Sequence, residues 1–174
     1  MDKYIFLDID GVTNSQLWFE KLLKHKKTYN NRLDRFVKKY LDPDAIKLLN
    51  TLVENTNAKV VISSSHRVSY ELKELQEAFK IVGFTGEIIG KTPKLYFVGE
   101  NGYNYSVSRG EEIMAWLRIN NAENSPYIIF DDDSDMLLKQ RENYFRVDNY
   151  CGLTPNLIYR ATIFLNKFSP TLKK

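Results

Sequence analysis

Carboxylates follow two separate apolar runs of the sequence, at the point where each run stops. Asp8 and Asp10 come after one run near the amino terminus, and Asp131 and Asp132 come after another. If these acids meet, two charges about 4 Å apart repel by about 4 kcal/mol at an effective dielectric near 20, unless a cation lies between them. Oxygen ligands without cysteine or clustered histidine favour Mg²⁺, which usually shares a phosphate oxygen with a substrate. The pattern therefore indicates a magnesium site that handles a phosphate ester.

Hydroxyl side chains end a third apolar run, where Ser63 and Ser64 follow Val60-Val61-Ile62. All three runs have the short length and the β-branched or aromatic content of buried strands. Strands that alternate with helices form a parallel sheet covered on both faces, and ligands bind at the carboxyl ends of such strands. We therefore expect an α/β fold in which the acids and the serines gather along one edge of the sheet.

Hydrophobic periodicity and turn residues divide the chain into short elements. Strands are expected at residues 3–8, 58–65, 86–90, 125–131 and 144–147. Helices are expected at residues 16–40 (two helices, separated near 30–31), 42–55, 69–82, 111–119 and 135–141, with a last helix capped by Thr154-Pro155. The pair Asn101-Gly102 between alternating segments predicts a hairpin over residues 95–107.

Length and composition limit the class of protein. The chain has 174 residues, of which 43% are hydrophobic and 27% charged, and this predicts one globular domain over residues 1–174. A single cysteine, Cys151, supports neither an internal disulfide nor a cysteine-based zinc site, so we expect a reducing, cytoplasmic location. No segment resembles a signal peptide or a membrane span, and we expect neither membrane attachment nor an obligate protein partner.

The first acidic motif, Asp8-Ile9-Asp10-Gly11-Val12, resembles the Asp-x-Asp-Gly motif of the haloacid dehalogenase (HAD) superfamily of phosphohydrolases. The resemblance covers most of the chain and implies a Rossmann-like, HAD-like parallel sheet covered by helices. It also implies that Asp8 attacks phosphorus to form an aspartyl-phosphate, while Asp10 protonates the leaving oxygen and later activates water. Gly11 is expected to allow a sharp exit from the strand beside the substrate.

The second and third superfamily motifs find counterparts in the same order along the chain. Ser63, with Ser64 beside it, matches the hydroxyl residue that donates a hydrogen bond to the transferred phosphoryl group. Arg109 matches the basic residue that neutralises this group, and Lys91 is the competing candidate. Arg67 follows the serines and is expected to contact substrate. Serines also cap helices, and lone basic residues also lie on solvated faces, so these readings stay open.

The fourth motif is the acidic pair Asp131-Asp132, which the resemblance assigns to a Mg²⁺ site together with Asp8 and Asp10. Asp132 is the first candidate ligand of the pair and Asp131 the second. Many relatives have glycine at the position of Asp131, so the choice between the two stays open.

A narrower likeness connects the chain with HAD-type phosphatase domains associated with RNA-repair proteins. Three segments carry it: Ser63-Ser64-Ser65-His66-Arg67, Asp131-Asp132-Asp133-Ser134-Asp135-Met136 and Gly152-Leu153-Thr154. Within these segments Asp133 is expected to cap a helix, and Asp135 can either cap or take part in the site.

A strongly basic stretch lies between the first and the second motif. Residues 20–39 contain eight Lys or Arg and two acids, a local charge of +6. The superfamily places a substrate-capping insertion here, and we expect residues 14–41 to form a small helical cap. Such a charge over a phosphate site attracts polyanions. Interleaved aromatic residues can stack on bases or pack between helices: Trp18, Phe19, Tyr29, Phe36 and Tyr40.

These observations favour a Mg²⁺-dependent phosphomonoester hydrolase, or phosphatase, whose substrate is a nucleotide or the phosphorylated end of a polynucleotide. One alternative is a catalytically silent HAD scaffold that binds nucleic acid or a protein partner. Another is a phosphotransferase that uses the same residues with an alcohol as acceptor. The sequence leaves the choice between 3′- and 5′-phosphates open.

Overall fold

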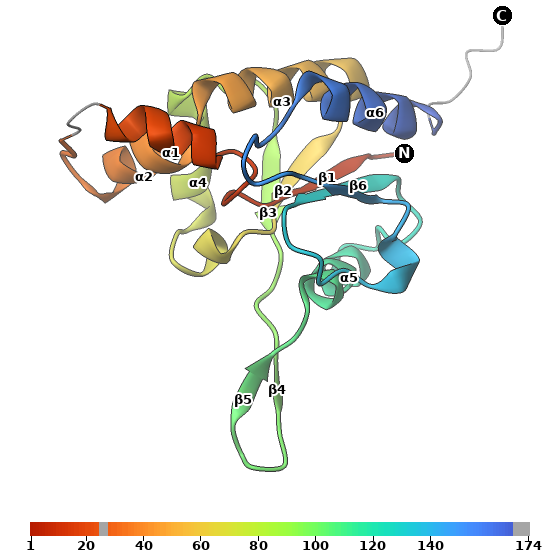
Figure 1. Ribbon diagram of the computed structural model, residues 1–174. Helices are drawn as coiled ribbons and strands as arrows, with labels where there is room; N and C mark the ends of the chain where they lie inside the picture. The colour runs from red at the N-terminus through yellow and green to blue at the C-terminus, as the bar shows by residue number, and fades with distance from the viewer. Residues whose placement is uncertain (25–27, 169–174) are drawn as a thin grey trace, which may run out of the picture.

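The protein forms a parallel sheet of five strands in the order β3-β2-β1-β6-β7, in a computed structural model that describes residues 1–24 and 28–168 (Figure 1). The strands are β1 (Tyr4–Leu7), β2 (Lys59–Ile62), β3 (Ile88–Lys91), β6 (Tyr127–Asp131) and β7 (Tyr144–Arg146). β1 lies in the centre and pairs with β2 on one side and β6 on the other. The predicted α/β architecture is confirmed, and each strand predicted for the sheet is present.

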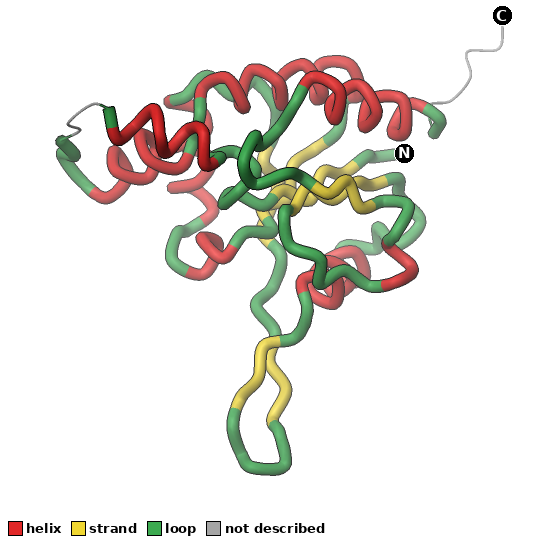
Figure 2. The backbone as a smooth tube through the Cα atoms, viewed as in Figure 1, coloured by secondary structure: helices red, strands yellow, loops and turns green. Residues whose placement is uncertain are grey.

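Helices cover both faces of this sheet (Figure 2). They are α1 (Gln16–Leu23), α2 (Arg32–Tyr40), α3 (Pro43–Thr56), α4 (Leu72–Ile81), α5 (Arg109–Ile119) and α6 (Pro155–Asn166), with two short 3₁₀ turns, η1 (Ser65–Val68) and η2 (Leu138–Gln140). Asp42 caps α3 ahead of Pro43, and Thr154 caps α6 ahead of Pro155, as predicted. Among the residues that the structure describes, no helix is long and apolar enough to cross a membrane.

The central strand β1 is buried on both faces, which explains why its sequence is an unbroken apolar run. Ile5 and Leu7 belong to the core formed with α3, α4 and α6. Tyr4 and Phe6 face the other core, where the ring of Trp116 on α5 lies 5.2 Å from Tyr4 and 5.4 Å from Phe6. This double burial fixes the strand and therefore the position of the residues that follow it.

The segment predicted as a cap, residues 14–41, contains the two helices α1 and α2. Phe36 of α2 is fully buried in the core, 4.6 Å from the ring of Tyr70, and Trp18 donates from Nε1 to the carbonyl of Lys39 at 3.0 Å. These aromatic side chains therefore hold α1 and α2 against the body of the protein. Residues 25–27 of the basic stretch lie outside the described residues.

The helix predicted at residues 135–141 was wrong. Only the short turn η2 forms there, because the polar side chains that begin and end this stretch make other contacts. Asp135 accepts a hydrogen bond from the backbone of Arg109 at 2.8 Å. Gln140 donates to the carbonyl of Gly110 at 3.0 Å. The segment thus packs against the start of α5 in place of forming a helix of its own.

The predicted hairpin over residues 95–107 is confirmed, with β4 (Tyr96–Val98) paired antiparallel to β5 (Asn104–Ser106). Its turn consists of residues 100–102. The residues on either side of the turn are joined by a hydrogen bond from the backbone N–H of Gly99 to the carbonyl of Tyr103 at 2.9 Å. Gly102 has a φ of +78°, which suits the left-handed residue of such a turn. Asn101-Gly102 therefore ends the turn and does not form its centre.

Candidate active site

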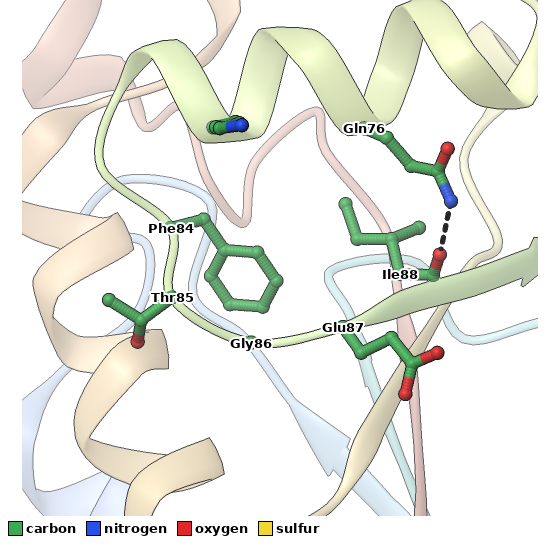
Figure 3. A pocket seen from close by; sticks show the side chains of 7 residues that line it. Gln76, Phe84, Thr85, Gly86, Glu87 and Ile88 are labelled. Carbon is green, nitrogen blue, oxygen red and sulfur yellow. Dashed lines mark hydrogen bonds between the residues drawn. The ribbon is translucent and has the colours of Figure 1, made fainter.

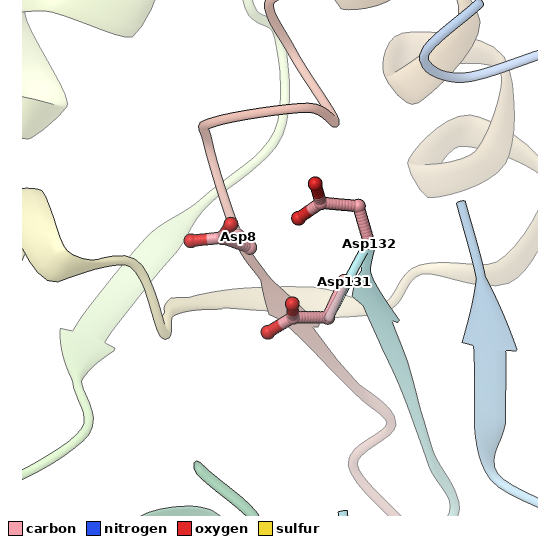
Figure 4. Close-up of side chains that lie close together, drawn as sticks. All are labelled: Asp8, Asp131 and Asp132. Carbon is pink, nitrogen blue, oxygen red and sulfur yellow. The ribbon is translucent and has the colours of Figure 1, made fainter. Parts of the chain in front are cut away.

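Three carboxylates meet at the carboxyl edge of the sheet (Figure 4). Asp8 follows β1, Asp131 is the last residue of β6, and Asp132 follows it. Each contributes an oxygen that lies within 4.8 Å of the other two. The parallel pairing of β1 with β6 brings them together, because the backbone N–H of Asp8 donates to the carbonyl of Phe130 at 2.9 Å.

Burial makes this group of charges unfavourable without a counter-ion. Asp8 is 6% exposed and Asp131 only 2%. Burial, opposed mainly by the charge of Arg109, raises the pKa of Asp8 to about 6. Burial and the nearby charge of Asp8 raise the pKa of Asp131 to about 8. In the described part of the chain Oδ2 of Asp131 accepts no hydrogen bond, although the Nε of Arg109 lies 3.6 Å from it. The three carboxylates therefore fit a hard divalent cation.

The turn after β1 depends on Gly11, whose φ is +73°. A side chain at this position would collide with the Oδ2 of Asp132. Burial raises the pKa of the Asp132 carboxyl, whereas a hydrogen bond from Asn149 acts to lower it. Gly11 is thus required both for the backbone conformation and for the approach of the third carboxylate.

Asp10 lies beside this group and has different partners. Its Oδ1 accepts a hydrogen bond from Asn14 at 3.0 Å, and its Oδ2 lies 3.1 Å from Nε2 of His66. Burial acts to raise the pKa of Asp10, but the hydrogen bonds from His66 and Asn14 outweigh it and leave this pKa below its usual value. The carboxylate group therefore consists of Asp8, Asp131 and Asp132. Asp10 is not one of the three, and its role as a metal ligand stays a prediction.

The imidazole of His66 connects Asp10 with the helices of residues 14–41. Its ring lies 4.4 Å from that of Tyr40 and 5.3 Å from that of Phe36, both on α2. The side chain is only 15% exposed. The residue order alone does not indicate this role of His66, because the packing of α2 against the serine turn joins segments that are far apart in the sequence.

The two serines after β2 are both buried but differ in their contacts. The Ser64 side chain forms a hydrogen bond with Asp8 that lowers the pKa of that carboxyl, and it also accepts from the backbone of His66 at 3.4 Å. The Oγ of Ser63 is fully buried and has no hydrogen-bond partner among the described residues. The structure therefore places Ser64 against the expected nucleophile and leaves Ser63 with an unsatisfied hydroxyl next to it in sequence.

Arg109 reaches the carboxylates from the first residue of α5. Its Nε lies 3.6 Å from Oδ2 of Asp131, and its charge acts to lower the pKa of Asp8. The carboxylate of Asp135 accepts a hydrogen bond from the backbone N–H of Arg109 at 2.8 Å. Of the two roles that the sequence left open for Asp135, capping and a part in the site, the structure thus shows capping, at the start of α5. Lys91, the competing candidate, instead donates from Nζ to the carbonyl of Tyr70 at 2.7 Å.

Arg67 is buried below the serine turn and is bonded to protein acceptors. It donates to the carbonyls of Ser64 at 2.7 Å and Thr92 at 3.1 Å, and it pairs with the carboxylate of Glu112. These contacts support the turn that carries the serines, and a substrate contact of Arg67 stays a prediction. Glu112 also lies 3.6 Å from Arg109, three positions before it on the same helix, so one carboxylate contacts both arginines.

Asp133 takes a supporting position next to the carboxylate group. Its backbone N–H donates to Oδ1 of Asp131 at 3.0 Å, and its carbonyl accepts from the hydroxyl of Tyr144 at 2.5 Å. Burial raises the pKa of Tyr144 to about 12. These backbone bonds orient Asp131. The prediction that Asp133 caps a helix was wrong, because no helix begins directly after it, but the residue does have a structural role.

Two hollows differ in their relation to this site. One of about 450 Å³ is lined by Asp132, Arg146 and Asn149, and it opens beside the carboxylates. Another of about 360 Å³ lies between α4 and the start of β3, lined by residues that include Gln76 and Phe84 (Figure 3). The start of β3 is at the opposite edge of the sheet from Asp8, so this second hollow is not part of the carboxylate site. The site is therefore identified by its carboxylates and not by the shape of a hollow.

Comparison with family models adds an independent observation. Residues 4–158 match the model of the HAD domain in Swiss Army Knife RNA repair proteins. The chain belongs to this family. The matched range spans both pairs of acids, the two serines and Arg109. The predicted resemblance to HAD domains of RNA-repair proteins is confirmed. The five-stranded parallel sheet is the Rossmann-like fold expected of a HAD domain. A search of curated proteins found no match to this HAD domain.

Proposed function

We propose that this HAD domain is a phosphomonoesterase that transfers the phosphoryl group of its substrate to Asp8 and then to water. The observation that carries the proposal is the convergence of Asp8, Asp131 and Asp132 within 4.8 Å of one another. Three buried or partly buried carboxylates repel one another unless a cation compensates them, and the family description supports phosphatase-type chemistry.

In the first half of the proposed reaction, an oxygen of Asp8 forms a bond to phosphorus while the ester P–O bond breaks. Asp10 gives its proton to the leaving oxygen, which departs as an alcohol. In the second half, Asp10 takes a proton from water as the water oxygen attacks phosphorus. The bond between phosphorus and Asp8 breaks, and inorganic phosphate leaves with the nucleophile restored.

The remaining residues of the site hold the phosphoryl group and control charge. Arg109 and the hydroxyl of Ser64 face Asp8, where they can donate to phosphoryl oxygens. Asp8, Asp131 and Asp132 would hold Mg²⁺, which when bound supplies positive charge against the three carboxylates and the phosphoryl oxygens. Without a cation the pKa of Asp8 is raised, which disfavours the ionised carboxylate that a nucleophile requires. The proposed chemistry therefore needs the cation.

For the substrate, we favour the phosphorylated end of a polynucleotide over a mononucleotide. The family description names RNA repair, and Lys39 on α2 is near enough to the site for its charge to act on Asp10, where it lowers the pKa of that carboxyl. Positive charge close to a phosphate site attracts a chain that carries several phosphates.

A substrate panel tests the proposal. It compares p-nitrophenyl phosphate, nucleoside monophosphates and oligonucleotides with a 3′- or 5′-phosphate, each with Mg²⁺ and with a chelator. We expect phosphate release that requires the cation and is lost in Asp8→Asn, with the fold unchanged by circular dichroism. Asp10→Asn should lower turnover by about 10²- to 10⁴-fold, the usual contribution of general acid–base catalysis. Release that persists in Asp8→Asn would show that Asp8 is not the nucleophile, whereas an inactive wild type across the whole panel would favour a binding module.

A further inference from the structure

The β4–β5 hairpin is attached at both ends to the edge of the sheet that carries the site. It leaves the sheet after β3 ends at Lys91 and returns to α5, which begins at Arg109. Figure 1 shows the hairpin extending away from the body of the protein, on the side of α5 and away from α3 and α6. All six residues of its two strands are exposed.

One face of the hairpin is aromatic. Phe97 pairs directly with Tyr105, and the hydrogen bond between Gly99 and Tyr103 continues the ladder, so the side chains of Phe97, Tyr103 and Tyr105 point to the same face. Their exposed fractions are 53%, 71% and 43%. We call these three side chains the aromatic face. Exposed aromatic side chains that lie together often mark a surface that binds another molecule.

The ring of Tyr105 is held in place although it is exposed. It stacks on Phe97 with centroids 5.4 Å apart and an angle of 22° between the planes. Its hydroxyl accepts a hydrogen bond from Asn101 at 2.6 Å. A Cβ at Gly99 would come within 2.6 Å of the ring, so the glycine allows the ring to lie across the strand. A fixed ring with an open surface is preorganised for stacking.

We propose that the aromatic face stacks against the bases of a single-stranded polynucleotide whose terminal phosphate is in the carboxylate site. This inference rests on the proposed phosphatase function and specifies its substrate as a strand several nucleotides long. Every base has a π face, so aromatic rings bind single strands without reading a sequence. The aromatic residues of α2 are less suited to this role, because Phe36 is buried and Tyr40 packs on His66.

Basic side chains at the root of the hairpin favour a polyanion over a second copy of this chain. Lys94 lies just before β4, where its Nζ is 3.3 Å from the carboxylate of Glu112 and 5.4 Å from the centre of the Tyr96 ring, which is on the other face of β4. Arg109 begins α5 shortly after β5. The strands themselves have three residues each, which offers little edge for pairing with another protein strand. A strand of nucleic acid can follow these charges from the site to the aromatic face.

The length of chain between the site and the aromatic face sets the length of substrate. Tyr105 and Arg109 are four residues apart, which spans at most about 14 Å when fully extended. A stacked strand rises by about 3.4 Å per nucleotide, so the first base on Tyr105 is at most about four nucleotides from the bound phosphate. An octanucleotide, which spans about 27 Å when stacked, is therefore long enough to reach the aromatic face from the site.

The test measures hydrolysis by wild type, Phe97→Ala and Tyr105→Ala with three substrates: p-nitrophenyl phosphate, a mononucleotide and a phosphorylated octanucleotide. Each alanine variant should raise KM for the octanucleotide by about 5- to 150-fold, which corresponds to the ~1–3 kcal/mol measured for one base on one aromatic ring. The two small substrates report on the carboxylate site alone. Val98→Ala, on the opposite face of β4, is the matched control and should leave all three substrates unchanged.

Binding measurements separate this inference from the proposed function. Fluorescence anisotropy with Asp8→Asn should show that replacing the bases of the octanucleotide with abasic sites weakens binding as much as Tyr105→Ala does. An octanucleotide KM and affinity that are unchanged in both alanine variants would overturn the inference, even if Asp8→Asn abolishes turnover. Sedimentation that shows a dimer lost in Tyr105→Ala, with unchanged affinity for the octanucleotide, would also overturn it and assign the face to a second copy. If the wild type hydrolyses nothing, the proposed function fails, and the anisotropy experiment still decides the inference.

Discussion

Replacing Asp131 by asparagine removes one of the three converging charges with almost no change in shape. Burial, together with the charge of Asp8, raises the pKa of Asp131 from 3.8 to about 8. The folded protein therefore holds a proton that the unfolded chain has already released. This contribution to stability is complete at low pH and is lost as the pH rises from about 4 to about 8.

The magnitude follows from the width of this pH window. One pKa unit corresponds to about 1.4 kcal/mol, so the ionisation of Asp131 should take at most about 4 kcal/mol from the free energy of unfolding of wild type between about pH 4 and pH 7, when no divalent cation is present. Asparagine does not ionise, and its amide oxygen can still accept the hydrogen bond that Asp133 donates to Asp131 at 3.0 Å. The free energy of unfolding of Asp131→Asn should therefore depend much less on pH.

Urea unfolding in chelator, at intervals from about pH 5 to about pH 8, measures this difference. Added Mg²⁺ should offset part of the loss in wild type, with a gain of about 2.7 kcal/mol at a hundredfold excess over Kd, and should stabilise Asp131→Asn less. Glu123→Gln is the control, because Glu123 is 52% exposed and pairs only with Arg118 among the described contacts. Parallel pH profiles for wild type and Asp131→Asn, or an equal gain from Mg²⁺, would refute the reasoning.

Three further substitutions test separate parts of the site. Gly11→Ala should cost about 1–2 kcal/mol of backbone strain and also weaken the thermal stabilisation by Mg²⁺, whereas Gly83→Ala, with φ +90° and open space around it, should cost strain alone. Glu112→Ala leaves a buried guanidinium without its partner and should lower the free energy of unfolding in urea by about 3–5 kcal/mol, and a loss below about 1 kcal/mol would contradict the buried pairing. Arg109→Met should reduce kcat/KM for p-nitrophenyl phosphate by about 10²- to 10³-fold. Lys91→Met should change it little, and equal losses would show that the assignment of the basic residue is wrong.

The sheet and the place of the site were predictable because burial acts on whole runs of residues. A strand covered on both faces must be apolar throughout, so Tyr4–Leu7 and Tyr127–Phe130 are recognisable without any neighbour. The acids that end these runs then have to meet, because parallel strands share a carboxyl edge. The existence of the carboxylate group therefore follows from local sequence.

The individual partners in the site were less predictable, because they depend on contacts between distant segments. Ser63 and Ser64 differ by one position, which sends their side chains to different surroundings after the strand. Arg67 and Arg109 cannot be told apart by their charge. The packing of α5 decides that Arg67 pairs with Glu112 and that Arg109 reaches Asp131. Asp135 likewise accepts a hydrogen bond from the backbone of Arg109, 26 positions away in sequence. This long-range contact is one reason why the helix predicted at residues 135–141 does not form.

His66 touches both Asp10 and the aromatic residues Phe36 and Tyr40 of α2. Helix α2 and the carboxylate expected to relay protons therefore contact the same imidazole. A substitution that moves the ring of Phe36 or Tyr40 should also move this imidazole, and with it one of the two partners that orient the Asp10 carboxylate.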